Sequence, residues 1–187
     1  MKKLKQITLV LTILCSINLY SMEEALTQQF QIFMQKPIRF RASLPQILLT
    51  IYRINHEIPP EVDDETKTRI TNERLHALGY QNPIIHAATY YQDIYDQKFG
   101  AALILKTEQR FANALKIIMP LAVHFLDPRA IFFIAIISCE IHDYAHGLES
   151  AQWAKRCGYP NMQQVNQMMA MCQIKLQEQS ASQDTHE

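Results

Sequence analysis

The sequence predicts an all-α protein of about seven or eight helices. Only four glycines occur in 187 residues, and no segment alternates apolar and polar residues as a half-buried strand would. Features that start and stop helices recur instead. Pro follows a Ser, Asn or Asp at several helix starts, and single glycines follow apolar stripes.

The first 21 residues are expected to be a secretory signal peptide. Three lysines precede an apolar run from Ile7 to Cys15, and polar residues lead to a plausible cleavage point near Ser21. The run is shorter than the ~20 residues of a membrane-spanning helix. We therefore expect export to the periplasm or the medium, with a lipid anchor on Cys15 as a minor alternative and no membrane span after cleavage.

The charge balance argues against a nucleic-acid partner. The chain has 18 basic and 18 acidic residues, and without the three lysines of the leader it keeps 15 basic and 18 acidic residues, a net charge of −3. No basic face stands out that would attract a phosphate backbone. Residues 22–177 suit a single helical domain, followed by a polar tail, 178–187, that we expect to be disordered.

The first three helices are predicted from their ends. One runs from about residue 22 and stops before Pro37, and a second opens at Ser43 with Pro45 in its first turn. Acidic residues from Asp63 favour the N-terminus of a third, because the helix dipole is positive there, and Gly79 is its expected stop.

The middle of the chain is expected to contain two more helices. Asn82-Pro83 gives the cap-then-proline pattern of a helix start, and Gly100 is expected to interrupt that helix. A further helix is expected over 101–119, ending or bending at Pro120, because proline lacks the amide hydrogen that a helix interior needs.

Three helices are expected in the C-terminal part. Asp127 caps a helix whose run 131–137 is apolar on every side, which predicts a central buried helix. The next is predicted over 147–157, before Gly158. Asn161 opens the last one, which carries an apolar stripe.

Residues 128–158 resemble a tetratricopeptide-like helical hairpin. The positions that carry the resemblance are Ala130, Ala135, Asp143, Tyr144, Ala151, Trp153, Ala154 and Gly158. The resemblance implies stacked hairpins in the C-terminal half and a groove that holds a protein or peptide partner. Tyr91, Tyr95 and Trp153 are the candidate partner-binding residues.

The His-Asp-x-x-His stretch is a candidate metal site. The His142-Asp143 pair after a buried helix resembles that of HD-type metal-dependent phosphohydrolases, most of all the class I cyclic-nucleotide phosphodiesterases, which also have a histidine at the position of His146. Residues 80–88 resemble their Tyr-His-Asn-x-x-His-Ala segment. The resemblance implies a divalent metal ion held by His86, His142 and Asp143, which would activate water for attack on phosphorus.

A structural role explains the same stretch. At an elbow between two helices, Asp143 would accept the free amide hydrogens of the second helix, and His146 would lie on its exposed first turn. The metal set also departs from the family, which has histidine at Gln81 and aspartate at Thr89. We therefore favour the elbow. A bound metal belongs to the alternative, and we expect no catalytic residue and no cofactor otherwise.

Three cysteines follow the leader: Cys139, Cys157 and Cys172. Their odd number permits one disulfide and one free thiol in an oxidising compartment. All three occupy apolar positions of helical patterns, which favours burial as small hydrophobic residues. The sequence as a whole predicts an exported helical module that binds a protein or peptide, with a metal-dependent phosphohydrolase as the alternative.

Overall fold

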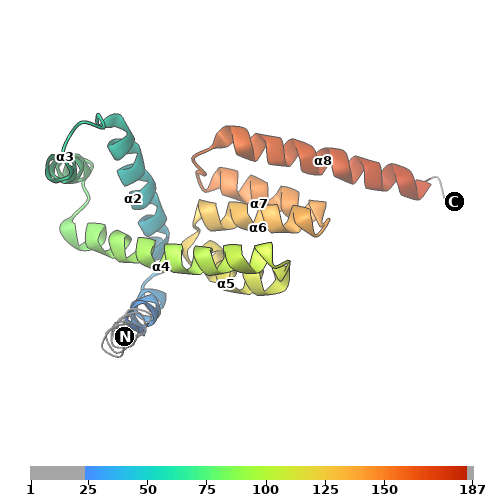
Figure 1. The fold of residues 1–187 in the computed structure, drawn as a ribbon, viewed down its shortest axis with the longest axis horizontal. Coiled ribbons are helices and arrows are strands. Elements are labelled where there is room, and N and C mark those ends of the chain that lie inside the picture. The colour runs from blue at the N-terminus through green and yellow to red at the C-terminus, as the bar shows by residue number, and fades with distance from the viewer. Residues whose placement is uncertain (1–23, 185–187) are drawn as a thin grey trace, which may run out of the picture. The chain divides into compact units, whose positions relative to one another are not determined.

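The computed structural model describes residues 24–184, which form eight helices and no strand (Figure 1). The predicted fold class is therefore confirmed. The predicted signal peptide and its Cys15 lie outside the described residues. No helix among residues 24–184 is both long and apolar enough to cross a bilayer.

The chain divides into two compact units at residues 36 and 37. Of the first unit, the structure describes a single helix, 24–34, which ends in a turn where the amide of Lys36 donates to the carbonyl of Phe33 at 2.9 Å. This helix stops before Pro37, as predicted.

The second unit holds seven helices. They are α2 (Ile38–Glu57), α3 (Asp64–Ala77), α4 (Asn82–Thr107), α5 (Phe111–Phe125), α6 (Pro128–Glu140), α7 (Tyr144–Arg156) and α8 (Met162–Asp184). From α4 onward each helix packs on the next one in the chain, and α2 packs against α3, α4 and α5 (Figure 1). The C-terminal half is thus a sequential stack of antiparallel helices.

Three helices begin at polar residues that the sequence predicted, whereas Ser43 and Asn82 lie inside α2 and α4 and do not cap them. Asp63 accepts the amide of Thr66 at 2.9 Å, and Asn161 accepts the amide of Gln164 at 3.0 Å. Asp127 caps α6 in the same way. These short polar side chains satisfy amide groups that the first turn of a helix leaves without partners.

The predicted interruption at Gly100 is wrong, and α5 does not end at Pro120. α4 runs without a break through Gly100, and Pro120 lies inside α5. The chain turns instead at Gln109, whose φ is 58°. There the amide of Gln109 donates to Lys106 at 2.9 Å and that of Arg110 to Leu105 at 2.8 Å, which is the Schellman pattern of a helix end. Glycine costs a helix only about 1 kcal/mol, so packing overrides it at position 100.

Two other boundaries also differ from the predictions. α2 begins at Ile38, so Pro45 is inside the helix rather than in its first turn. The expected disordered tail is helical as far as Asp184, because Gln, Glu and Ala residues favour helix and Lys175 forms an ion pair with Glu178 at 2.7 Å.

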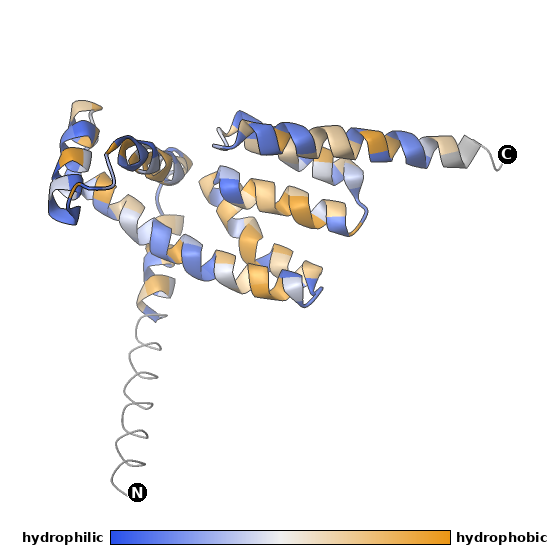
Figure 2. Ribbon diagram, turned by 45° about the horizontal axis from the view of Figure 1, so that its top comes forward, coloured by the Kyte–Doolittle hydropathy of each residue, from blue (hydrophilic) through white to orange (hydrophobic). Residues whose placement is uncertain are grey.

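α6 is the centre of the stack. Its residues from Ala130 to Ala135 are all buried, and Figure 2 colours it hydrophobic along most of its length, whereas α8 alternates between hydrophilic and hydrophobic turns. A second apolar cluster joins α2, α3 and α4. It consists of Ile54, Ile58, Leu75 and Ile85, with Ile51, Val62, Ile70 and Tyr80 packed against it.

Candidate functional site

A groove of about 370 Å³ lies between α5, α6 and α7. Its apolar wall consists of Leu115, Met119, Ile134, Ile141 and Trp153. Met119 and Ile141 are 39% and 44% exposed, although large apolar side chains are usually buried. The volume is within the range of natural ligand pockets. The exposed apolar residues make this groove the strongest candidate for a binding site on the described part of the chain.

The polar rim of the groove carries two carboxylates. Asp143 and Glu149 line it together with His146, Ser138 and Ser150. Asp143 Oδ1 accepts the amide of His146 at 3.2 Å, and its Oδ2 lies 2.7 Å from His146 Nδ1. Asp143 is therefore the cap of α7, as the favoured elbow interpretation predicted, while Glu149 is an exposed carboxylate beside the apolar wall.

The apolar surface continues from the groove onto the outer face of α5. A shallow hollow of about 510 Å³ shares Leu115 and Met119 with the groove. Its other lining residues are Ala112, Lys116, Pro120, Val123 and His124. The groove therefore has room on one side for a ligand longer than a single side chain.

Trp153 is the residue of the predicted partner-binding set that lines the groove. The helix α7 places it there, and small residues on either side, Ala151 and Ala154, are fully buried against the neighbouring helices. Tyr91 and Tyr95 are only 0% and 6% exposed. Their predicted contact with a partner is therefore wrong, because neither ring reaches the surface.

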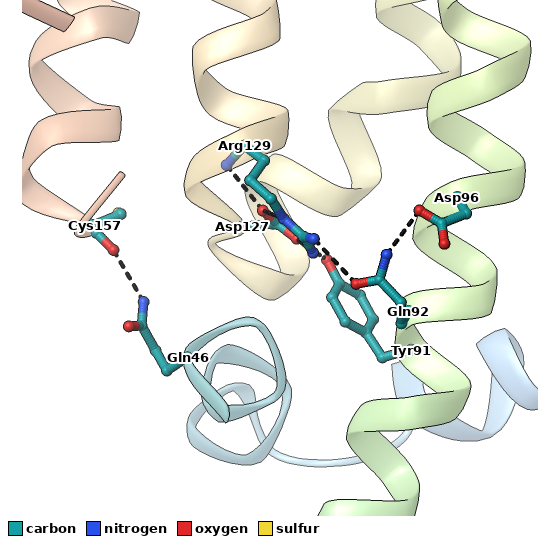
Figure 3. A network of polar contacts seen from close by, with 7 residues as sticks. All are labelled: Gln46, Tyr91, Gln92, Asp96, Asp127, Arg129 and Cys157. Atoms are coloured by element: carbon teal, nitrogen blue, oxygen red, sulfur yellow. Dashed lines mark hydrogen bonds and ion pairs between the residues drawn. The ribbon is translucent and has the colours of Figure 1, made fainter. Parts of the chain in front are cut away.

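Tyr91 belongs to a buried polar network at the start of α6 (Figure 3), and Tyr95 lies against the same network. Asp127 is fully buried, and its Oδ2 accepts from the Tyr91 hydroxyl and from Arg129 Nη2, both at 2.8 Å. Arg129 also donates from Nε to Asp127 Oδ1 at 3.1 Å and from Nη1 to Gln92 at 3.0 Å. Its guanidinium carbon lies 3.7 Å above the ring of Tyr95.

The network raises the pKa values of the two tyrosines and of its arginine. Burial, and then the charge of Asp127, raise the pKa values of Tyr91 and Tyr95 well above the usual tyrosine range. Burial alone would lower the pKa of Arg129, but its hydrogen bonds and ion pair with Asp127 raise it. The Tyr91 hydroxyl therefore stays a neutral donor to Asp127, and the network joins α4 to α6.

A groove of about 430 Å³ beside this network is a weaker candidate. It lies between α2 and α4 and is lined by Tyr52, Asn55, Gln92, Arg129 and others. The charge of Arg129 is already balanced by Asp127, with which it forms an ion pair at 2.8 Å. An anionic ligand would therefore gain little from this guanidinium.

The predicted metal ligands do not converge. Lys106 near the end of α4 forms an ion pair with Glu140 at 2.6 Å, which places that end of α4 beside the α6–α7 turn. His86 lies twenty residues earlier on the same unbroken helix, about 30 Å away along its axis. It cannot share an ion with His142. Across residues 24–184, no three His, Cys, Asp or Glu side chains are grouped for metal binding.

His142 ends α6 instead. Its φ is 63°, its amide donates to Cys139 at 3.1 Å, and the amide of Asp143 donates to Ser138 at 2.8 Å. This is the Schellman pattern again, with histidine at the left-handed position that glycine usually takes. His142 and His146 therefore belong to two different helix ends rather than to one face of a continuous helix.

Replacing His142 with glycine is expected to raise the free energy of unfolding by roughly 0.5–1 kcal/mol. The left-handed conformation costs a non-glycine residue about 1–2 kcal/mol, which the substitution removes. The greater freedom of glycine in the unfolded chain offsets only part of this stabilisation. His146→Gly is the control, since this histidine is inside α7 and glycine should be destabilising there. Urea unfolding checks both, and a destabilised His142→Gly variant would contradict the assignment.

In comparisons with known proteins, no protein-family model, no curated protein and no solved structure matches the chain. The resemblance of residues 128–158 to a tetratricopeptide-like hairpin therefore stays a prediction.

Proposed function

We propose that the protein is a protein–protein interaction module that binds a linear segment of a partner protein in the groove between α5, α6 and α7. The observation that carries this proposal is the position of Trp153 beside the exposed apolar side chains Met119 and Ile141. Tryptophan is enriched among residues that dominate binding energies, and methionine adapts its shape to different ligands.

The chemistry of the groove suggests what the segment contains. An apolar side chain of the partner would pack between Trp153 and Met119, where it would be shielded from water. A lysine or arginine next to it would reach Glu149 and Asp143 on the rim. The hollow on α5 would accept the continuation of an amphipathic helix or an extended peptide. With the signal peptide predicted for residues 1–21, this binding would take place outside the cytoplasm.

The test starts from a displayed library of random linear peptides selected on the purified protein. Selected peptides are expected to combine an apolar residue with a basic one, and to change the fluorescence of Trp153, which is the only tryptophan of the chain. Affinities are then measured by fluorescence polarisation with dye-labelled peptide, which does not depend on the tryptophan.

Trp153→Ala is expected to weaken the binding of selected peptides roughly 30-fold, the usual effect of removing an anchor residue. Glu149→Lys should weaken binding of peptides with a basic residue about tenfold by charge repulsion. Tyr90→Ala is the control, because this tyrosine is 53% exposed on α4 and does not line the groove. Peptides that bind the Trp153→Ala variant as tightly as the original chain would contradict the proposal.

A further inference from the structure

Two thiols from distant parts of the chain meet beneath α7. Cys139 near the end of α6 and Cys172 in the middle of α8 are 33 residues apart, and their Sγ atoms lie 3.1 Å from each other. The thioether sulfur of Met168 is 3.4 Å from Cys139 Sγ on the same side. The two thiol groups are in direct contact, whereas most buried cysteines pack singly against carbon atoms.

Gly147 of α7 makes room for this contact. A Cβ atom added at Gly147 would lie 2.7 Å from Cys139 Sγ and 3.3 Å from Cys172 Sγ, both closer than ordinary packing allows. The missing side chain therefore lets the two sulfurs occupy the space where α7 crosses between α6 and α8. By contrast, Gly100 has no atom within 4 Å of such a Cβ.

We infer that Cys139 and Cys172 are a redox pair that closes into an intramolecular disulfide when the folded chain meets a disulfide oxidant, and that the bond ties α8 to α6. A disulfide bond requires the two sulfurs to approach by roughly 1 Å more. The oxidant is a low-molecular-weight disulfide or the disulfide of an oxidoreductase.

The reaction is thiol–disulfide exchange. Cys139 is partly exposed whereas Cys172 is fully buried, so an oxidant reaches Cys139, whose thiolate attacks it and releases one thiolate. Cys172 then loses its proton and attacks Cys139 Sγ in the mixed disulfide, which releases the second thiolate. In sum, two protein thiols and one disulfide give one protein disulfide and two thiols of the former oxidant.

The surroundings make the first step dependent on pH. Burial and the hydrogen bond with Cys172, and then the charges of Cys172, Asp143 and Glu140, raise the pKa of Cys139 to about 12. The reactive thiolate is therefore scarce near neutral pH, and its fraction rises tenfold with each pH unit below the pKa. Oxidation is accordingly expected to be slow at neutral pH and faster under alkaline conditions.

Cys157 cannot take part in this bond. It follows the end of α7, where its carbonyl accepts from Gln46 Nε2 at 2.9 Å. It lies ten residues after Gly147, about 15 Å further along the helix axis than the two sulfurs. Cys157 is thus the unpaired thiol of the three, and it serves as an internal reference for accessibility and reactivity.

The test uses the reduced, purified chain incubated with oxidised glutathione at mildly alkaline pH, once in native buffer and once in urea. After acid quenching and alkylation, peptide mass mapping is expected to show a Cys139–Cys172 crosslink with the loss of two hydrogens. Cys157 should carry only glutathione or the alkylating group. The equilibrium between the protein disulfide and glutathione gives the effective concentration of one cysteine thiol at the other. This effective concentration should be at least about tenfold higher in the native chain than in urea.

Four variants sharpen the test. Cys157→Ser should leave the crosslink unchanged, and Cys139→Ser should abolish it. Gly147→Ala should reduce the native effective concentration about tenfold by displacing the sulfurs, while Gly100→Ala should not. Circular dichroism shows whether Gly147→Ala is folded. The comparison of native and urea conditions does not depend on that variant.

Oxidation is also expected to raise the midpoint of thermal unfolding by about 5–10 °C, since the bond closes a long loop in the unfolded chain. Either of two results would overturn the inference. One is glutathione accumulating on Cys139 without a crosslink in the native chain. The other is an effective concentration in native buffer no higher than in urea.

Discussion

Asp127→Ala is expected to lower the free energy of unfolding by about 3–5 kcal/mol, the usual effect of removing one partner of a buried ion pair. The variant would leave Arg129 without its counter-ion, although only 21% of that side chain is exposed. It would also leave the buried Tyr91 hydroxyl without its acceptor and remove the cap of α6. Urea unfolding followed by circular dichroism measures the loss.

Two further variants separate these contributions. Asp127→Asn keeps the shape and an oxygen that can cap α6 but removes the charge, so its loss should fall between that of Asp127→Ala and zero. Asp93→Ala changes an exposed aspartate of α4 and should alter stability by less than about 0.5 kcal/mol. An Asp127→Ala variant as stable as Asp93→Ala would show that the network contributes no stability.

Phe125→Ala is expected to lower the free energy of unfolding by about 3–5 kcal/mol, as large-to-small changes in a well-packed core do. Phe125 is fully buried at the end of α5, and its ring is stacked on that of Tyr91 with 4.6 Å between the centroids. The following residue, Leu126, has a φ of 53°, so the backbone is sharply turned there and cannot easily close a cavity.

The control for Phe125→Ala is Ile104→Ala, which truncates a side chain of α4 that is 60% exposed and should change stability by less than about 1 kcal/mol. Phe125 and Asp127 share Tyr91 as a neighbour, so the double variant should lose less than the two single losses added together. A Phe125→Ala loss equal to that of Ile104→Ala would contradict the packing described for this junction.

Three helix starts were predictable from the sequence, whereas the starts of α2 and α5 and several helix ends were not. Asp63, Asp127 and Asn161 cap the helices that they were predicted to open, since a short polar side chain can bond the free amide groups locally. Of the four Schellman ends, those with Gly79 and Gly158 were predicted, and those with Gln109 and His142 were missed. Both residues are exposed and neither is a glycine, so their residue types give no signal of the left-handed conformation.

The residues of the groove were likewise only partly predictable from the sequence. Trp153 was a predicted partner-binding residue because tryptophan is enriched at interfaces, and it lines the groove. Met119 and Ile141 were not predicted, because they come from α5 and from the α6–α7 turn, and their neighbours are set by the order of packing. The Asp127–Arg129 pair was visible only as a cap. Nothing in its spacing reveals Tyr91, 36 residues away.

The unbroken helix α4 has a consequence for how the molecule unfolds. Its first turns contribute Ile85 to the cluster with α2 and α3, its middle contributes Tyr91 to the network with α6, and its last turn contributes Lys106 to the ion pair with Glu140. Because all three regions share this helix, the unfolding of any one of them is expected to destabilise the other two. Gly100 is the position where this helix would most easily be interrupted, yet the helix continues through it. We therefore expect residues 37–184 to unfold in one cooperative step.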